Sequence, residues 1–162
     1  PYQTASFDVC FCHFFLMWVD APSALNEMRR VVHPGGWVLA LAEPDYGGRI
    51  DYPDELSQVG RLQAQALRRQ GAEPNMGRQL AGLFSQCGLI EARGGIIGGE
   101  WTSRRSQASL ESEWQVIRDD LHDLTSRKEL RGWYLLDRAA SADGSRVLYV
   151  PVFYAAGRVP PD

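Results

Sequence analysis

The sequence predicts an α/β fold, and most of that prediction comes from one stretch near its start, Phe7 to Glu43. Two long apolar runs lie within it, Asp8 to Leu16 and Trp37 to Ala42, and neither alternates as a half-solvated strand does. Such runs are typical of parallel strands covered on both faces. The segment between them has helical periodicity, so the stretch predicts a strand, helix, strand unit.

The connecting helix is expected from about Ala21 to Val32, where apolar residues recur at helical spacing and polar residues take the opposite face. Pro22 suits the first turn, and either Asp20 or Ser23 can cap it. The helix should stop at the segment 33–36, His-Pro-Gly-Gly, because proline cannot continue the ladder and glycine tolerates a left-handed turn.

The remaining elements follow from the same patterns and from turn residues. Ser109 is expected to begin a helix as part of a capping box. Pro151 cannot donate to a sheet, so the last strand should bulge there or turn that position out of the ladder. The elements expected are helices at 53–69, 77–87, 109–124 and 127–140, and strands at 89–102 and 146–157.

The order of three motifs carries a family resemblance: an FD-apolar strand, a helix closing on EMRRVVHPGG, and a strand WVLALAEP. Together they resemble the middle of a class I S-adenosylmethionine-dependent methyltransferase. In that family they form the fourth strand, the next helix and the fifth strand of a seven-stranded Rossmann-like sheet. The resemblance therefore implies a partial Rossmann-like sheet, strands four to seven with the last antiparallel, flanked by helices.

The resemblance also implies how much of the family's domain is present. Residues 1–162 would be the carboxyl-terminal part of a single methyltransferase domain, with the amino-terminal cofactor-binding half absent. The glycine-rich run from Arg93 to Gly99 does not replace the missing cofactor loop, because no helix is expected to open at its last glycine. These glycines are better explained as a bend in a strand.

The activity implied is methyl transfer from S-adenosyl-L-methionine to a small-molecule acceptor. This is an in-line displacement, so the protein mainly aligns nucleophile and methyl group and excludes water. The family's residues at the end of the fourth strand line the cofactor pocket, and they correspond here to Cys12, His13 and Phe14. His13 is a candidate general base, with packing or cofactor contact as the alternative role.

A polar and aromatic loop follows the second strand of the unit. Ligands of open α/β sheets bind at the carboxyl ends of parallel strands, so this loop is the expected acceptor site. A surface loop of this composition needs no function, which is the alternative. The candidate substrate-binding residues are Glu43, Asp45, Tyr46, Arg49 and Tyr52.

Composition narrows the function classes further. The 162 residues suit one domain, and a net charge of −3 with dispersed arginines makes nucleic acid a poor partner. Cys10 and Cys12 lie on one face of a strand, but no second ligand pair completes a metal site. The 3 cysteines are best explained as small hydrophobes in a reducing cytoplasm. No window is long enough to span a membrane.

The implied missing half has a consequence for association. Without a neighbouring strand, Asp8 to Leu16 would become an apolar edge with Phe11, Phe14 and Phe15 uncovered, and such an edge pairs readily with another chain. We therefore expect self-association or pairing with an amino-terminal half, and no methylation by this chain alone. The alternative function is a non-catalytic assembly or regulatory half-domain.

Overall fold

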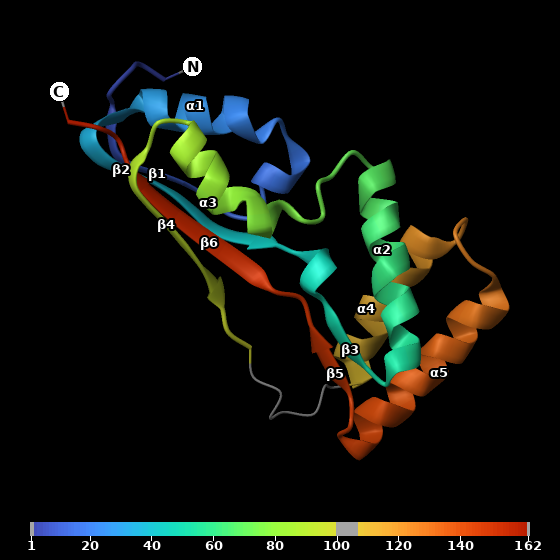
Figure 1. Cartoon of the computed structure of the whole chain (residues 1–162). Helices are drawn as coiled ribbons and strands as arrows, with labels where there is room; N and C mark the ends of the chain where they lie inside the picture. Colours follow the sequence, from blue (N-terminus) through green and yellow to red (C-terminus); the bar gives the residue numbers. More distant parts are fainter. Residues whose placement is uncertain (1, 100–106, 162) are drawn as a thin grey trace. The chain divides into compact units, whose positions relative to one another are not determined.

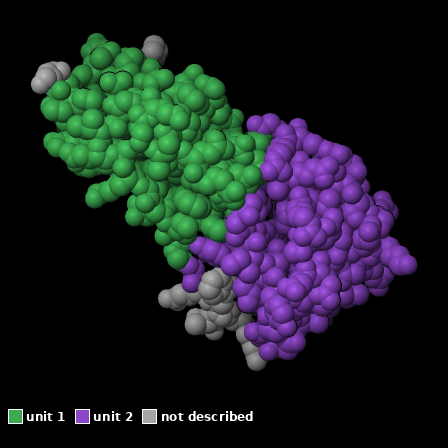
Figure 2. Space-filling model, viewed as in Figure 1, with its two compact units in different colours: residues 1–45, 72–98, 151–162 green, residues 46–71, 99–150 purple. Residues whose placement is uncertain are grey.

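A computed structural model describes residues 2–99 and 107–161 (Figure 1). The chain forms two compact units, drawn in green and purple in Figure 2. Unit 1 comprises residues 1–45, 72–98 and 151–162, and unit 2 comprises residues 46–71 and 99–150. The chain thus leaves unit 1 after Asp45 and again after Gly98, and returns each time.

Unit 1 is built on a four-stranded sheet of order β1-β2-β6-β4. Strand β1 pairs parallel with β2, whereas β6 lies antiparallel between β2 and β4. The sequence-based expectation of a partial Rossmann-like α/β sheet, with the last strand antiparallel, is confirmed. The strands are β1 (Phe7–Cys12), β2 (Val32–Pro44), β4 (Ile90–Ile97) and β6 (Val152–Arg158).

Two helices, α1 (Ala21–Val31) and α3 (Met76–Gln86), pack on one face of this sheet (Figure 1). Alternate residues of β2 show which face is covered: Val38 and Ala40 are fully buried, whereas Leu41 is 41% exposed. Both helices lie within one residue of their predicted bounds. Of the two capping candidates, Asp20 fills the role, since its carboxylate accepts the Ser23 amide at 3.0 Å.

The first strand differs from its prediction in length and in burial. It ends at Cys12, and the residues predicted to continue it instead turn at Phe14 and form a short 3-10 helix, η1 (Leu16–Trp18). Val9 is 46% exposed and Phe11 65% exposed, so the expectation of a strand covered on both faces is wrong. The described residues place helices against one face of the sheet, which leaves the β1 side chains on the other face in solvent.

The second strand begins earlier than predicted. The segment 33–36 ends the helix as expected, but the strand was predicted to begin at Trp37, whereas β2 starts at Val32 and runs through the segment. Gly35 has φ +81, and its amide donates to the Val159 carbonyl at 3.0 Å. Hydrogen bonding to the carboxyl-terminal segment therefore extends the strand through residues whose local preference is for a turn.

The described residues of unit 2 form three α-helices and a two-stranded antiparallel sheet. The helices are α2 (Ser57–Arg69), α4 (Gln107–Leu121) and α5 (Arg127–Asp143), and the strands are β3 (Ile50–Tyr52) and β5 (Val147–Tyr149). A 3-10 helix, η3 (Asp54–Leu56), precedes α2. The helices share a hydrophobic core, and its buried members are Leu56, Val59, Ala66, Leu110, Trp114, Ile117, Leu121 and Leu130.

Two predictions in this part of the chain are wrong. Ser109 lies inside α4, and the capping box is instead at α5, where Ser126 and Glu129 bond reciprocally. Hydrogen bonds from Ser126 and Thr125 lower the pKa of Glu129 to about 2. The segment 146–157 was predicted as one strand, but it forms two strands in different sheets, β5 and β6. The strand conformation is interrupted between Tyr149 and Val152, around Pro151. The end of the predicted strand 89–102 lies outside the described residues.

Candidate functional site

The carboxyl ends of β1 and β2 meet at one edge of the unit 1 sheet, as parallel neighbours must. Cys12 is the last residue of β1, His13 and Phe14 follow it, and Glu43 lies one residue before the end of β2. The two segments are joined directly, because the Phe14 amide donates to the Ala42 carbonyl at 2.8 Å. The structure thus brings the three predicted cofactor residues and Glu43 into one place.

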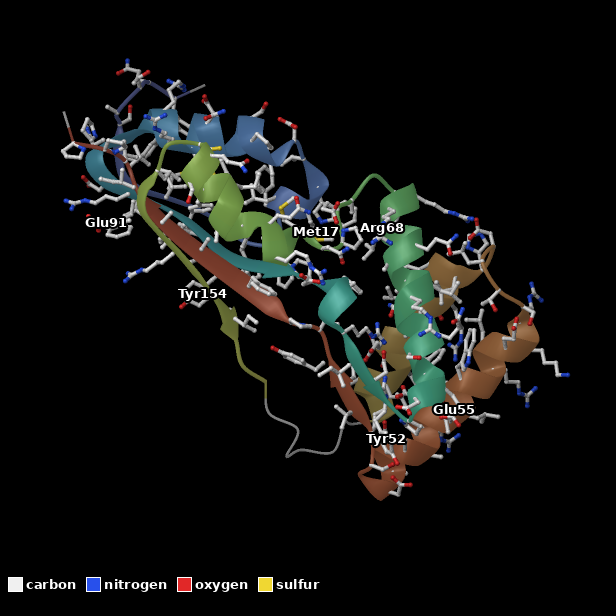
Figure 3. The ribbon with its side chains drawn as sticks, viewed as in Figure 1. Met17, Tyr52, Glu55, Arg68, Glu91 and Tyr154 are labelled. Carbon is white, nitrogen blue, oxygen red and sulfur yellow. The ribbon has the colours of Figure 1, made fainter. Side chains whose placement is uncertain are left out.

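Glu43 is fully buried, and its carboxylate is surrounded by backbone amides. Its Oε1 accepts from the amides of Phe15 at 2.9 Å and Leu16 at 2.8 Å, and its Oε2 accepts from Met17 at 3.2 Å. Successive amides that converge on one anion form a strong, charge-assisted set of bonds. Glu43 therefore fixes the turn after β1, which ends at Met17, a residue labelled in Figure 3.

The backbone of that turn is strained at Phe14, whose φ is +48. Aromatic residues rarely adopt this conformation, which costs of order 1–3 kcal/mol and persists only where neighbouring structure imposes it. The Phe14 ring contacts the His13 ring edge-on, with centroids 4.6 Å apart and planes at 78°. Both side chains are exposed, so the turn presents a pair of aromatic rings to solvent at the strand end.

Cys12 is half-buried beneath this turn. Burial, and then the negative charges of Glu43 and Cys10, raise the pKa of its thiol to about 12. A thiol with this pKa stays protonated near neutral pH and is a poor nucleophile. Cys12 can contact a ligand but is not suited to covalent catalysis.

Asp45 is also buried, and it pairs with a residue that the sequence did not single out. Arg78 of α3 donates from Nε and Nη2 to the two Asp45 oxygens, each at 2.6 Å. This two-pronged geometry holds the carboxylate firmly and raises the pKa of Arg78. The Arg78 side chain is 53% exposed, so it presents positive charge beside the strand end.

The other three predicted substrate residues belong to unit 2. Tyr46 is largely buried, and burial together with the Asp120 charge raises its pKa against the opposing effect of Arg49. The Arg49 guanidinium is 7% exposed and donates to Asp51 at 2.7 Å. Tyr52, labelled in Figure 3, is 53% exposed at the end of β3. Of these three residues, Tyr52 is the most accessible to a ligand.

Arg49 is part of a buried chain of alternating charges that the sequence did not reveal. Asp51 accepts from both Arg49 and Arg146, the latter at 2.8 Å. Arg146 also pairs with Asp137, which accepts from the Trp114 indole at 2.6 Å. The four charged side chains are at most 7% exposed. They tie β3 and α5 to the core of unit 2, which makes Arg49 a structural residue.

Two kinds of feature are not found in the described part of the chain. Within residues 2–99 and 107–161, no group of three or more metal-ligating side chains is arranged to hold a metal ion. No described helix combines the length and apolar character needed to cross a bilayer.

Comparison with known proteins links unit 1 to methyltransferases. Residues 1–40 match the family model described as a methyltransferase domain. An uncharacterized methyltransferase of Schizosaccharomyces pombe is 36% identical over 84 residues, which is 51% of this chain and 30% of that protein. The chain therefore spans less than a third of this relative's length.

Solved structures share the fold across the whole chain. The phosphoethanolamine N-methyltransferase 2 of Haemonchus contortus, in complex with phosphomonomethylethanolamine and S-adenosylhomocysteine, is 16% identical with a TM-score of 0.51, covering 100% of this chain and 35% of its own. A methyltransferase of Thermotoga maritima is 14% identical with a TM-score of 0.51, covering 98% and 58%. These findings confirm the resemblance carried by Phe7 to Glu43, which is that of a class I S-adenosylmethionine-dependent methyltransferase.

Proposed function

We propose that this chain takes part in methyl transfer from S-adenosylmethionine to a small-molecule acceptor. The observation that carries the proposal is the turn after β1: a strained aromatic turn, held by a buried glutamate, at the carboxyl end of a parallel strand within the family match. The Haemonchus contortus neighbour, by its description, holds S-adenosylhomocysteine and a small phosphorylated amine, which supports both parts of the proposal.

The residues present fit such a cofactor. The exposed rings of His13 and Phe14 offer apolar surface for a planar group, and the protonated thiol of Cys12 adds a neutral contact. The cofactor supplies the reactive methyl group when bound. These side chains would position it and exclude water, while Glu43 holds the turn that carries them. His13 remains the candidate base for an acceptor proton.

We infer that a further segment supplies the rest of the cofactor site, and that this chain alone is inactive. The described residues of unit 1 form a four-stranded sheet, and its order β1-β2-β6-β4 supports the proposal that these are strands four to seven of the family's seven. The apolar side chains of β1 are exposed along the sheet, where another strand and its helices would cover them. Longer relatives support this inference, since the chain spans 35% of the Haemonchus contortus enzyme.

Isothermal titration tests the cofactor proposal. We expect the full-length protein to release or absorb heat with both S-adenosylmethionine and S-adenosylhomocysteine, and the 162-residue chain to show no methylation of any acceptor tried. Absence of heat with both ligands in the full-length protein would overturn the proposal. Turnover by the chain alone would overturn the need for a further segment.

We propose that the stretch from Glu43 to Tyr52 binds the acceptor. Tyr46 and Tyr52 would contact it. The other candidates, Glu43, Asp45 and Arg49, would hold the stretch in its conformation. Tyr52→Ala in the full-length protein is expected to raise the acceptor KM several-fold and leave the cofactor Kd unchanged. Val116→Ala, a change at a residue 56% exposed in the same unit, is the control. Equal effects on both ligands would contradict an acceptor role.

We also propose that β1 is an interaction edge, either for an amino-terminal half or for a second copy. Sedimentation of the 162-residue chain should show concentration-dependent association, reduced by Phe11→Lys, because a charge on a 65% exposed edge residue opposes strand pairing. A stable monomer at high concentration, with slow exchange of the amides from Val9 to Phe15, would refute this. Association without any cofactor binding by the full-length protein would instead favour the non-catalytic half-domain.

A further inference from the structure

A basic groove runs between α4 and α5 in unit 2, and nothing in the proposed methyl transfer uses it. The groove encloses a cavity of about 740 Å³. Four arginines line it: Arg118 from α4, and Arg127, Arg131 and Arg138 from α5. The three α5 positions are four and seven residues apart, so they share one face of that helix. The charges therefore converge on the groove because of helical periodicity.

In the part of the chain that the structure describes, these arginines lack the acidic partners that several other arginines have. Among the residues that the structure describes, none of the four forms an ion pair with a carboxylate, whereas Arg69 of the same unit pairs with Asp123 at 3.1 Å. Of the nearby acids, Glu129 closes the capping box and Glu111 accepts from the Tyr134 hydroxyl. Like charges gathered in this way raise the local positive potential, and a bound anion lowers it.

The floor of the groove is apolar. Leu130 is buried and Leu135 is 50% exposed, and the Tyr134 ring lies between them on the same helix. The Arg118 guanidinium sits 5.0 Å from the Tyr134 ring centroid, which directs its charge over the aromatic surface. The Tyr134 hydroxyl donates to Glu111, so the ring is held in place.

Charge and apolar surface together define the ligand class. Guanidinium groups bind phosphate and carboxylate in a two-pronged geometry, and the cavity volume falls in the range of small-molecule sites. We propose that the groove between α4 and α5 binds an organic anion with an apolar body, either a phosphate ester or a carboxylate. This proposal concerns unit 2 alone and stands whether or not the chain takes part in methyl transfer.

Titration of the 162-residue chain with octyl phosphate, below its micelle concentration, tests the proposal. We expect saturable binding at one site, at least tenfold tighter than inorganic phosphate or octanol alone, because each of these offers half of the required chemistry. The double variant Arg127→Gln, Arg131→Gln should weaken octyl phosphate binding at least tenfold. Both arginines are exposed, so the fold should tolerate the change, which circular dichroism would verify.

The double variant Arg61→Gln, Arg68→Gln is the matched control. It removes the same charge from exposed positions of α2 and should leave the affinity unchanged. Equal weakening by both variants would show general charge attraction and overturn the site. Binding of inorganic phosphate as tight as that of octyl phosphate would overturn the need for an apolar body. Binding to anionic vesicles without binding of monomeric octyl phosphate would show a membrane-facing surface instead.

Discussion

Asp137→Ala is expected to lower the free energy of unfolding of unit 2 by about 3–5 kcal/mol, because it removes one of the two carboxylates that neutralise a buried network of arginines. Asp137 is 3% exposed and accepts from both Trp114 and Arg146. Its loss would leave the Arg146 guanidinium, which is 6% exposed, with Asp51 as its remaining carboxylate, and would leave the buried Trp114 indole N–H without its acceptor. Whole domains are stable by only about 5–15 kcal/mol, so this single change removes a large share.

The other ion pair of Arg146 does not compensate for the removal of Asp137. Arg146 also pairs with Asp51, which in turn pairs with Arg49, and the charges in this chain alternate and cancel. Removing one carboxylate leaves two arginines sharing Asp51. Both arginines are at most 7% exposed, so solvent compensates little for the lost charge.

Urea denaturation of Asp137→Ala, of a control variant and of the parent chain measures the free energy of unfolding. Asp123→Ala is the control, because it breaks an ion pair in the same unit whose side chains are 51% and 57% exposed. Exposed pairs contribute about 0–1 kcal/mol, so this variant should unfold close to the parent midpoint. Similar losses for both variants would show that the buried network contributes no more than a surface pair.

Features that depend on neighbouring residues could be predicted from the sequence, whereas features that depend on distant contacts could not. The parallel pair of strands, α1 and α3 follow from apolar periodicity and turn residues, which act locally. The end of β1 does not, because the apolar run continues through Phe15 while the turn is imposed by Glu43, 28 positions away. The exposure of the β1 side chains could not be predicted either, because burial depends on which other elements cover the strand.

For the candidate site, the order of motifs located Cys12, His13 and Phe14 at a strand end, and the structure joins that end to Glu43. It could not separate residues that face a ligand from residues that hold the loop. Asp45 and Arg49 look like ligand groups in a polar loop, yet Asp45 pairs with Arg78 of α3 and Arg49 pairs with Asp51 of β3. Nothing in the sequence pattern of α3 indicates that Arg78 pairs with Asp45.

Glu43→Gln is expected to lower the pKa of Cys12 and so to increase the thiolate present at a given alkaline pH. The negative charge of Glu43 is the second cause of the raised value, after burial, so the pKa should fall from about 12 but stay above the ordinary value of 9.0. A thiol pKa raised by folding contributes no loss of stability below pH 9.0, and stability then declines as the pH approaches about 12. In the variant, the pH range over which stability declines should be narrower, because its upper limit, the pKa of Cys12 in the folded state, is lower.

The rate of alkylation of Cys12 by iodoacetamide, followed by mass spectrometry between pH 8 and pH 11, reports the thiolate. The variant's profile should shift to lower pH, while Cys87, whose raised pKa has burial as its main cause, should react as in the parent. Asp45→Asn removes another buried carboxylate from the same strand end and should leave the Cys12 profile in place. Glu43→Gln also weakens the bonds to the turn amides, which would expose Cys12 at every pH. A rate increase that is uniform across pH would therefore mean that Glu43 acts through the turn and not through its charge, and would contradict the prediction.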